Sequence, residues 1–357
     1  MNGGVETFWI KKFRKVMVTH SRTTISNEDK ISVFKCLESG NLTAGELNKS
    51  FSVEFAKFIG VRGVRLTVSG TMAFYKILLA YGIKAGDEIA IPDYICNTLL
   101  GPIKVLGAIP KIYDNAPFSW NSSIEEILKV VSPRTKVVLV NHTFGFPFEE
   151  IECLKKKLGG HIKIVEDSCH RVVPRDFDDN TVCEFSDCAF YSFNSTKYLS
   201  TGEGGAIASN DIYFLEQLDQ FYLGDQLSDL NCALGLSQLR NVSTFIARRL
   251  EIATVYLDNF SNYLPMSYRE LCGCYFRFPI LVEDDTPFMG NRKVAYRKGV
   301  DSLLCQTVEE PYLPNSRKQL MKTISLPIYP SLSDDGLNMV VKETLKILEN
   351  GNQISHF

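Results

Sequence analysis

The feature that most constrains this chain is an alternation of short apolar runs with helical patterns between residues 64 and 208. Each apolar run has the length of a buried strand, and the segments between the first five runs carry apolar residues at helical spacing. Such alternation predicts a mainly parallel sheet covered by helices, with right-handed crossovers. The predicted strands are 64–68, 88–91, 111–113, 137–140, 162–165, 188–192 and 206–208, and the predicted helices are 71–81, 97–106, 122–131 and 149–158.

Further elements are predicted on both sides of this alternation. Helices are expected before it at 26–38, where Ser26 or Asn27 is a candidate N-cap, and at 46–59. A long helix is expected after it over about 231–260, followed by a strand at 275–282 and a terminal helix at 339–348. A chain of 357 residues can bury more than one core. We therefore expect a large α/β domain with an N-terminal segment over residues 1–240 and a small α+β domain over 241–357.

Composition excludes several classes of protein. A net charge of −2 argues against a nucleic-acid binder and against a protein held electrostatically at a membrane. No segment approaches the roughly 20 apolar residues of a membrane span, and the first residues lack the pattern of a signal peptide. The ten cysteines lack the spacing of a zinc site, so we expect no metal and free thiols in a reducing compartment. These observations together predict a soluble, cytoplasmic protein.

Polar residues follow several predicted strands at the point where each strand ends. Ser69-Gly-Thr71 follows the first strand and begins a helix, where N–H groups and the helix dipole favour an anion. Asp167 follows the fifth strand, and Ser192 ends the sixth, five residues before Lys197. Each alone has an ordinary structural explanation as a helix cap, a loop acid or a surface lysine. Because ligands sit at the carboxyl ends of parallel strands, their coincidence favours one shared site.

These residue types suit an aldehyde cofactor such as pyridoxal phosphate. The Lys197 amine can anchor an aldehyde covalently, and the Ser192 hydroxyl beside a helix start can bind a phosphate. An acid such as Asp167 can keep a pyridine nitrogen protonated, so that the ring accepts electrons. The sequence therefore favours a pyridoxal phosphate enzyme.

The chain resembles the DegT-type sugar aminotransferases, which are pyridoxal phosphate enzymes of fold type I. The resemblance covers roughly residues 25–350, and its motifs occur in the family's order and spacing. It implies an α/β fold with a mainly parallel sheet in the large domain and a small α+β C-terminal domain. The motifs are 40–45, 69–73, 86–92, 132–136, 165–170, 193–205, 228–239 and 325–330.

The resemblance also implies roles for individual residues. Lys197 would form the Schiff base with the cofactor and shuttle the proton, and Asp167 would pair with the pyridinium nitrogen. His170 stands where the family has a glutamine or histidine that contacts the ring hydroxyl. The phosphate would be bound by Ser192 together with Gly70 and Thr71.

The chain departs from the family's pattern in three places. The aromatic residue that stacks on the cofactor is replaced by Cys96, which could pack against the ring, or Tyr94 could substitute for it. The family's Asn-Tyr-Arg, whose asparagine reaches the phosphate of the neighbouring subunit, is replaced by Gly224-Asp-Gln226. The segment 205–228 is also shorter than usual. We expect these departures to alter the acceptor pocket.

The resemblance implies a homodimer that moves an amino group from an amino acid, usually L-glutamate, to a keto sugar, here expected to be nucleotide-linked. Three alternatives stay open at this point: a non-sugar ketone as acceptor, lyase or dehydratase chemistry, and a non-catalytic regulator on the same fold. The family's known dehydratases replace the lysine with histidine, so the presence of Lys197 argues against that branch.

Overall fold

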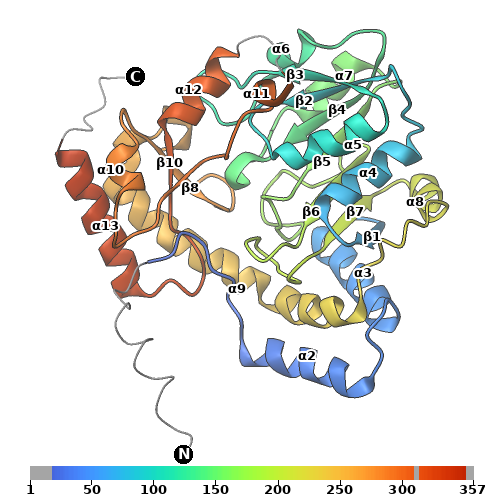
Figure 1. Ribbon diagram of the computed structural model, residues 1–357, viewed down its shortest axis with the longest axis horizontal. Helices are drawn as coiled ribbons and strands as arrows, with labels where there is room; N and C mark the ends of the chain where they lie inside the picture. Colours follow the sequence, from blue (N-terminus) through green and yellow to red (C-terminus); the bar gives the residue numbers. More distant parts are fainter. Residues whose placement is uncertain (1–17, 309–312, 351–357) are drawn as a thin grey trace, which may run out of the picture.

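A computed structural model describes residues 18–308 and 313–350 and contains a seven-stranded sheet covered by helices on both faces (Figure 1). The strand order is β1-β7-β6-β5-β4-β2-β3, and β7 alone runs antiparallel to its two neighbours. All seven predicted strands are confirmed, as is a mainly parallel sheet. The strands are β1 (Gly63–Thr67), β2 (Glu88–Pro92), β3 (Ile109–Tyr113), β4 (Thr135–Asn141), β5 (Lys163–Asp167), β6 (Cys188–Ser192) and β7 (Gly205–Ser209).

Helices bury the apolar side chains of both sheet faces. One face packs against Phe74 and Ile77 of α4, together with apolar residues of α5 and α8. The other face packs against Phe51 and Phe55 of α3, and against α6 and α7 farther along. The helices are α3 (Glu46–Ile59), α4 (Gly70–Ala80), α5 (Leu100–Val105), α6 (Ile124–Leu128), α7 (Ile151–Leu158) and α8 (Ile212–Asp219).

A second, antiparallel sheet of order β8-β10-β9 lies apart from the first. We call residues 261–308 and 313–350, which include this sheet and helices α10 to α13, the small lobe, and the seven-stranded sheet with its helices the large lobe. The elements of the small lobe are β8 (Phe278–Leu281), β9 (Arg297–Lys298), β10 (Thr323–Leu326), α10 (Thr286–Met289), α11 (Leu304–Val308), α12 (Pro314–Lys322) and α13 (Asp334–Glu349).

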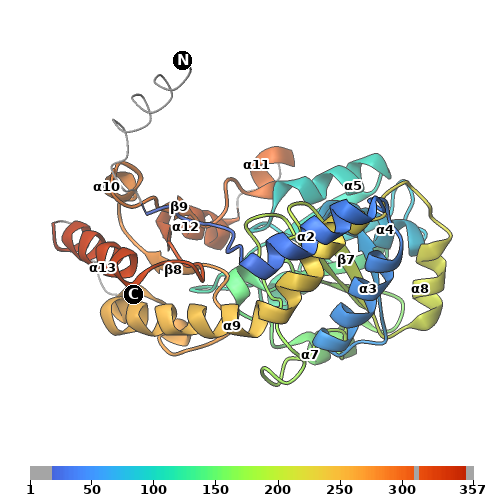
Figure 2. The same cartoon turned by 90° about the horizontal axis from the view of Figure 1, so that it is seen from below.

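One long helix, α9 (Asp229–Phe260), extends from the large lobe to the small lobe (Figures 1 and 2). It packs against α3 at its start and against β8 and α13 near its end. α2 (Asn27–Ser39) lies along its first half, as Figure 2 shows. The predicted domain boundary after residue 240 falls inside α9, which is continuous there; the two-domain division stays a prediction.

Some helices are capped by neighbouring residues and others by carboxylates from distant parts of the chain. Ser26 caps α2 locally, as one of the two predicted candidates, and forms a capping box with Asp29. Asp229 instead caps α3 from the first turn of α9. Its carboxylate accepts the backbone N–H groups of Gly45 (2.8 Å), Leu47 (3.2 Å) and Asn48 (2.8 Å). This contact joins the N-terminal helices to α9.

Two buried aspartates join the lobes in the same way. Asp93, directly after β2, accepts the N–H of Cys305 at 2.8 Å and so caps α11. Asp114, directly after β3, accepts the N–H groups of Asn315 (3.0 Å) and Ser316 (2.7 Å) and caps α12. Helix starts of the small lobe therefore dock on the carboxyl end of the large sheet.

All ten cysteines are free thiols and seven of them are buried, which confirms the prediction that the cysteines are free thiols. Within residues 18–308 and 313–350, no helix combines the length and apolarity needed to cross a membrane.

The cap on α3 predicts a loss of stability in Asp229→Ala. Removing the carboxylate leaves three backbone N–H groups without their acceptor, so we expect the free energy of unfolding to fall by about 2 kcal/mol. Urea unfolding followed by circular dichroism measures this loss. Asp258→Ala, which removes an exposed acid from the same helix, is the control and should change stability by less than about 0.5 kcal/mol. Equal effects in the two variants would contradict the role of Asp229.

Candidate active site

A cavity of about 550 Å³ lies at the carboxyl ends of the parallel strands of the large lobe and is closed on one side by residues of the small lobe. All eight residues that the sequence nominated for the site line this one cavity. They come from a helix start, loops and strand ends separated by up to 127 positions, so only the fold brings them together. They are Gly70, Thr71, Tyr94, Cys96, Asp167, His170, Ser192 and Lys197.

The N-terminus of α4 forms an anion cradle at one end of the cavity. The Ser69 hydroxyl accepts the N–H of Met72 at 3.1 Å and so caps the helix. Within the described part of the chain, the N–H groups of Gly70 and Thr71 donate no hydrogen bond. The end of β6 lies directly beside them, because a Cβ on Gly70 would come within 3.1 Å of the Ser192 Cβ. Two N–H groups that have no acceptor in the described chain and a hydroxyl therefore line the same space.

The glycine-rich turn before β7 makes this cradle possible. A Cβ on Gly205 would lie 2.4 Å from the carbonyl carbon of Ser69 and 2.6 Å from the nitrogen of Gly70. Gly205 also pairs with Thr67 of β1 and Ser192 of β6. The backbone of β7 thus lies directly against the start of α4, at a separation that only glycine permits.

Asp167 ends β5 and is buried, with an exposed fraction of 8%. Its Oδ1 accepts the N–H of Cys169 at 2.9 Å, and its carbonyl accepts the N–H of His142 at 3.3 Å. These two contacts hold the carboxylate at the wall of the cavity.

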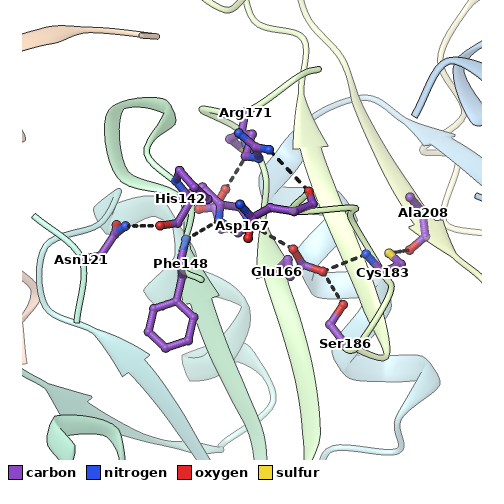
Figure 3. A network of polar contacts seen from close by, with 12 residues as sticks. Asn121, His142, Phe148, Glu166, Asp167, Arg171, Cys183, Ser186 and Ala208 are labelled. Atoms are coloured by element: carbon purple, nitrogen blue, oxygen red, sulfur yellow. Dashed lines mark hydrogen bonds and ion pairs between the residues drawn. The ribbon is translucent and has the colours of Figure 1, made fainter. Parts of the chain in front are cut away.

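The neighbouring Glu166 points to the opposite face of β5, as strand alternation requires (Figure 3). It bonds His142 Nε2 and the N–H of Cys183, both at 2.9 Å, and the hydroxyl of Ser186. Burial opposes its charge, but the hydrogen bonds from His142 and Ser186 outweigh burial and lower the pKa of Glu166. Since His142 also bonds the Asp167 backbone, this network supports the end of the strand that carries Asp167.

His170 lies between two aromatic rings. Its ring centroid is 4.2 Å from that of Phe276 and 6.4 Å from that of Phe144, with interplanar angles of 16° and 13°. Burial, followed by the positive charges of Lys197 and Arg277, lowers the pKa of His170 well below its ordinary value. The Phe144 N–H donates to Nδ1 at 3.4 Å, which assigns the proton of the neutral ring to Nε2.

Lys197 lies on the loop that follows β6, and its backbone N–H bonds the carbonyl of Asn194 at 2.9 Å. Its Nζ lies 4.8 Å from the centroid of the Phe276 ring. It makes no ion pair with any carboxylate in residues 18–308 and 313–350. The amine is therefore held against an aromatic face instead of being neutralised by an acid.

Arg277 of the small lobe lines the cavity, and Phe276 packs behind its lining residues; sequence reasoning missed both. Phe276 contacts Lys197 and His170, and the Arg277 guanidinium lies 5.6 Å from the same ring centroid. The strand predicted at 275–282 begins only at Phe278, which leaves both residues in a connecting segment. No local pattern marks them, because their position depends on contacts with the distant turn at residues 143–145.

Tyr94 and Cys96 occupy different parts of the cavity wall. Tyr94 is 1% exposed and packs its edge against Phe144, while its hydroxyl faces Gly299 so closely that a Cβ there would lie 1.9 Å away. Cys96 is exposed, with its Sγ 3.2 Å from the Thr98 hydroxyl. Which of them contacts a cofactor stays a prediction.

The segment that departs from the family's pattern folds onto its own chain. Asp225 is buried and forms an ion pair with Lys76 of α4 at 3.2 Å. Its carbonyl also accepts the N–H of Val68 at 2.9 Å, whereas Gln226 is exposed. The short segment is thus fixed beside the helix that begins the anion cradle.

The chain is similar in sequence to known proteins. A family model described as the DegT/DnrJ/EryC1/StrS aminotransferase family matches residues 23–345. The chain is 27% identical over 256 residues to a GDP-perosamine synthase from Escherichia coli O157:H7, covering 67% of this chain and 70% of that protein. These matches confirm the family resemblance that the motifs predict.

Solved structures share the fold. An aminotransferase, TlmJ from Streptoalloteichus hindustanus, is 24% identical with a TM-score of 0.85, covering 94% of this chain and 99% of TlmJ. NtdA from Bacillus subtilis, solved with bound cofactor PMP, is 21% identical with a TM-score of 0.82, covering 91% of this chain and 83% of NtdA. The predicted fold class is confirmed.

The neutral His170 predicts a pH dependence of stability. The unfolded chain binds a proton at His170 below about pH 6.5, whereas the folded protein resists it. Stability therefore falls as pH decreases from about 6.5 towards the lower pKa of the folded state, by up to about 1.4 kcal/mol per pH unit. In His170→Asn the free energy of unfolding should fall less steeply with decreasing pH, by up to about 1.4 kcal/mol per pH unit. Urea unfolding at pH 8 and 5.5 measures it, and identical declines in both proteins would refute the assignment.

The close contact at Gly205 predicts that Gly205→Ala forces the start of α4 away from β7. We expect the free energy of unfolding to decrease by about 1–3 kcal/mol, the usual cost of overpacking. Gly160→Ala is the matched control, because a Cβ at residue 160 meets nothing within 4 Å. If urea unfolding gives the two variants equal stability, the contact does not constrain the cradle.

Proposed function

The chain belongs to the DegT/DnrJ/EryC1/StrS aminotransferase family, and from this premise we propose that it transfers an amino group from an amino acid, L-glutamate, to a nucleotide-linked keto sugar. The single observation that carries the proposal is the convergence of Lys197, Asp167 and the α4 cradle on one cavity. The GDP-perosamine synthase that resembles this chain supports a nucleotide-linked sugar as acceptor. The motif resemblance supports L-glutamate as donor.

The cavity residues fit pyridoxal phosphate, and a relative of the same fold has bound cofactor PMP, its amine form. The cradle suits a phosphate, because the N–H groups of Gly70 and Thr71 at the start of α4 donate to no group in the described chain and line the cavity beside Ser192. Ser192 would add its hydroxyl, and Asp167 would hold a proton on the ring nitrogen. When bound, the cofactor supplies an aldehyde and an electron-accepting ring.

The remaining roles follow from the chemistry of the side chains. Lys197 would bind the cofactor covalently. Once the amino donor has displaced it, its freed amine would take the proton from the donor's Cα, and in the second half-reaction it would deliver a proton to the product's carbon. His170, neutral with its proton on Nε2, would donate a hydrogen bond to the ring hydroxyl. Cys96 or Tyr94 would contact the ring face.

A homodimer in the cytosol is part of the proposal. Three apolar side chains spaced along one face of α2, Ile31, Phe34 and Leu37, are 52%, 59% and 50% exposed, which supports burial against a second copy. The free thiols support a reducing compartment.

Covalent labelling tests the central claim. Purified protein is mixed with pyridoxal phosphate, reduced with borohydride and mapped by peptide mass spectrometry. We expect the pyridoxyl group on Lys197, and none on this peptide in Lys197→Ala. Lys104→Ala, which removes an exposed lysine, should still label at Lys197. A label elsewhere, or none at all, would overturn the proposal.

The reaction itself is tested in two halves. L-Glutamate should convert the bound cofactor to its amine form and release 2-oxoglutarate, and a nucleotide-linked 4-keto sugar should then restore the starting absorbance. Labelling of Lys197 without reaction across panels of amino acids and ketones would favour a non-catalytic regulator instead.

A further inference from the structure

Arg277 lines the same cavity as Lys197 but comes from the small lobe, directly before β8. Its guanidinium lies 5.6 Å from the centroid of the Phe276 ring, and the Nζ of Lys197 lies 4.8 Å from the same centroid. Two cationic groups therefore share one aromatic side chain at the wall of the cavity. The cofactor-phosphate cradle already has its own donors at α4, so Arg277 is not needed there.

The position of Arg277 is fixed by its surroundings. Its Nη1 donates to the carbonyls of Lys298 (3.2 Å) and Gly299 (2.5 Å). Its backbone N–H bonds the carbonyl of Phe144 at 3.4 Å. Gly145 holds the preceding residues, because its carbonyl accepts the N–H of Cys274 at 3.2 Å. The guanidinium is thus preorganised before any ligand arrives.

The rest of the guanidinium is not used within the described chain. Nε is buried and has no hydrogen-bond partner, and Nη2 donates to no group in residues 18–308 and 313–350. Burial lowers the pKa of Arg277 to about 10, so the group remains charged at neutral pH. Arg277 is half-buried and lines the cavity, so its unused Nη2 can donate to an anionic ligand there.

The acids that line the cavity do not neutralise Arg277. Asp301 forms its ion pair with Arg297 at 3.3 Å. Glu203 accepts a hydrogen bond from the Asn194 side chain at 3.0 Å, and Asp167 bonds the N–H of Cys169. No carboxylate in the described chain lies within ion-pair distance of Arg277. Within the described chain, the guanidinium is therefore left available to an anion that enters the cavity.

We propose that Arg277 binds the α-carboxylate of the amino donor and is a specificity-determining residue of the donor half-reaction. The proposal rests on the proposed aminotransferase function. In an amino acid the carboxylate is only two bonds from the reacting nitrogen. This short separation suits an arginine whose guanidinium lies beside the same aromatic ring, Phe276, as the amine of Lys197. In a nucleotide sugar the diphosphate is separated from a keto carbon by the sugar ring. A planar guanidinium matches a carboxylate well.

The test compares Arg277→Gln with Arg297→Gln, which removes the same charge from an exposed neighbour that does not line the cavity. Each half-reaction is followed separately by cofactor absorbance in the holoenzyme. For Arg277→Gln we expect kcat/KM for L-glutamate to fall about 100-fold, as for a lost charge-assisted contact, and mainly through KM. The acceptor half-reaction should stay within about twofold of the wild type. Arg297→Gln should leave both half-reactions within about twofold.

A binding measurement without turnover accompanies the kinetics. Maleate, an unreactive dicarboxylate, should perturb the cofactor absorbance of the wild type and of Arg297→Gln at the same concentrations. In Arg277→Gln the same change in absorbance should require a maleate concentration about 100-fold higher. Arg277→Lys keeps the positive charge but loses the planar guanidinium. We therefore expect kcat/KM for L-glutamate and the affinity for maleate each to fall about tenfold.

Several outcomes would overturn the proposal. A slower acceptor half-reaction with normal use of L-glutamate would assign the anion to the sugar nucleotide. Unchanged glutamate kinetics and maleate binding in Arg277→Gln would exclude an anion contact. If Arg277→Gln does not hold cofactor, Arg277→Lys decides the matter, and normal maleate binding there would refute the role. Failure of the proposed function itself is distinguished by absence of label on Lys197 in the wild type.

Discussion

The backbone of residues 274–277 is the part of the small lobe on which the cavity depends, and Arg249 of α9 holds it. The buried Arg249 guanidinium donates from Nη1 to the carbonyls of Tyr275 (3.3 Å), Phe276 (3.2 Å) and Ile328 (2.7 Å). The Tyr198 hydroxyl, one residue after Lys197, bonds the carbonyl of Cys274. Because buried carbonyls need donors, these contacts fix the segment that presents Phe276 to Lys197 and His170.

Close backbone approach completes this arrangement. A Cβ on Gly273 would lie 2.3 Å from the Gly145 carbonyl oxygen, and one on Gly145 would lie 3.0 Å from the nitrogen of Phe276. Both glycines have positive φ, at +77° and +96°. Hydrogen bonds to buried groups also join the lobes elsewhere, where the carboxylates of Asp93 and Asp114 accept N–H groups at helix starts of the small lobe. The cavity lies between these contacts, so its shape depends on how the lobes dock.

The large-lobe half of the site was predictable from sequence, and the small-lobe half was not. Asp167 and Ser192 end strands, and Gly70 and Thr71 begin the helix after a strand; parallel strands must end at one edge of a sheet. Phe276 and Arg277 precede a strand of another sheet, and the distant Gly145 turn determines where they lie. Nothing in their local sequence distinguishes an arginine that lines a cavity from one that lies on the surface.

Periodicity, helix caps and motif order were enough to determine the strands, the mainly parallel sheet, the family and the residues that converge at its carboxyl edge. These properties depend on short stretches of chain, where the spacing of apolar residues and a capping side chain such as Ser69 act locally. Only the tertiary structure decided the antiparallel direction of β7, the capping of α3 by Asp229 and the approach of Arg277 to Lys197. Each of these joins groups far apart in the sequence, and packing of the whole chain selects them.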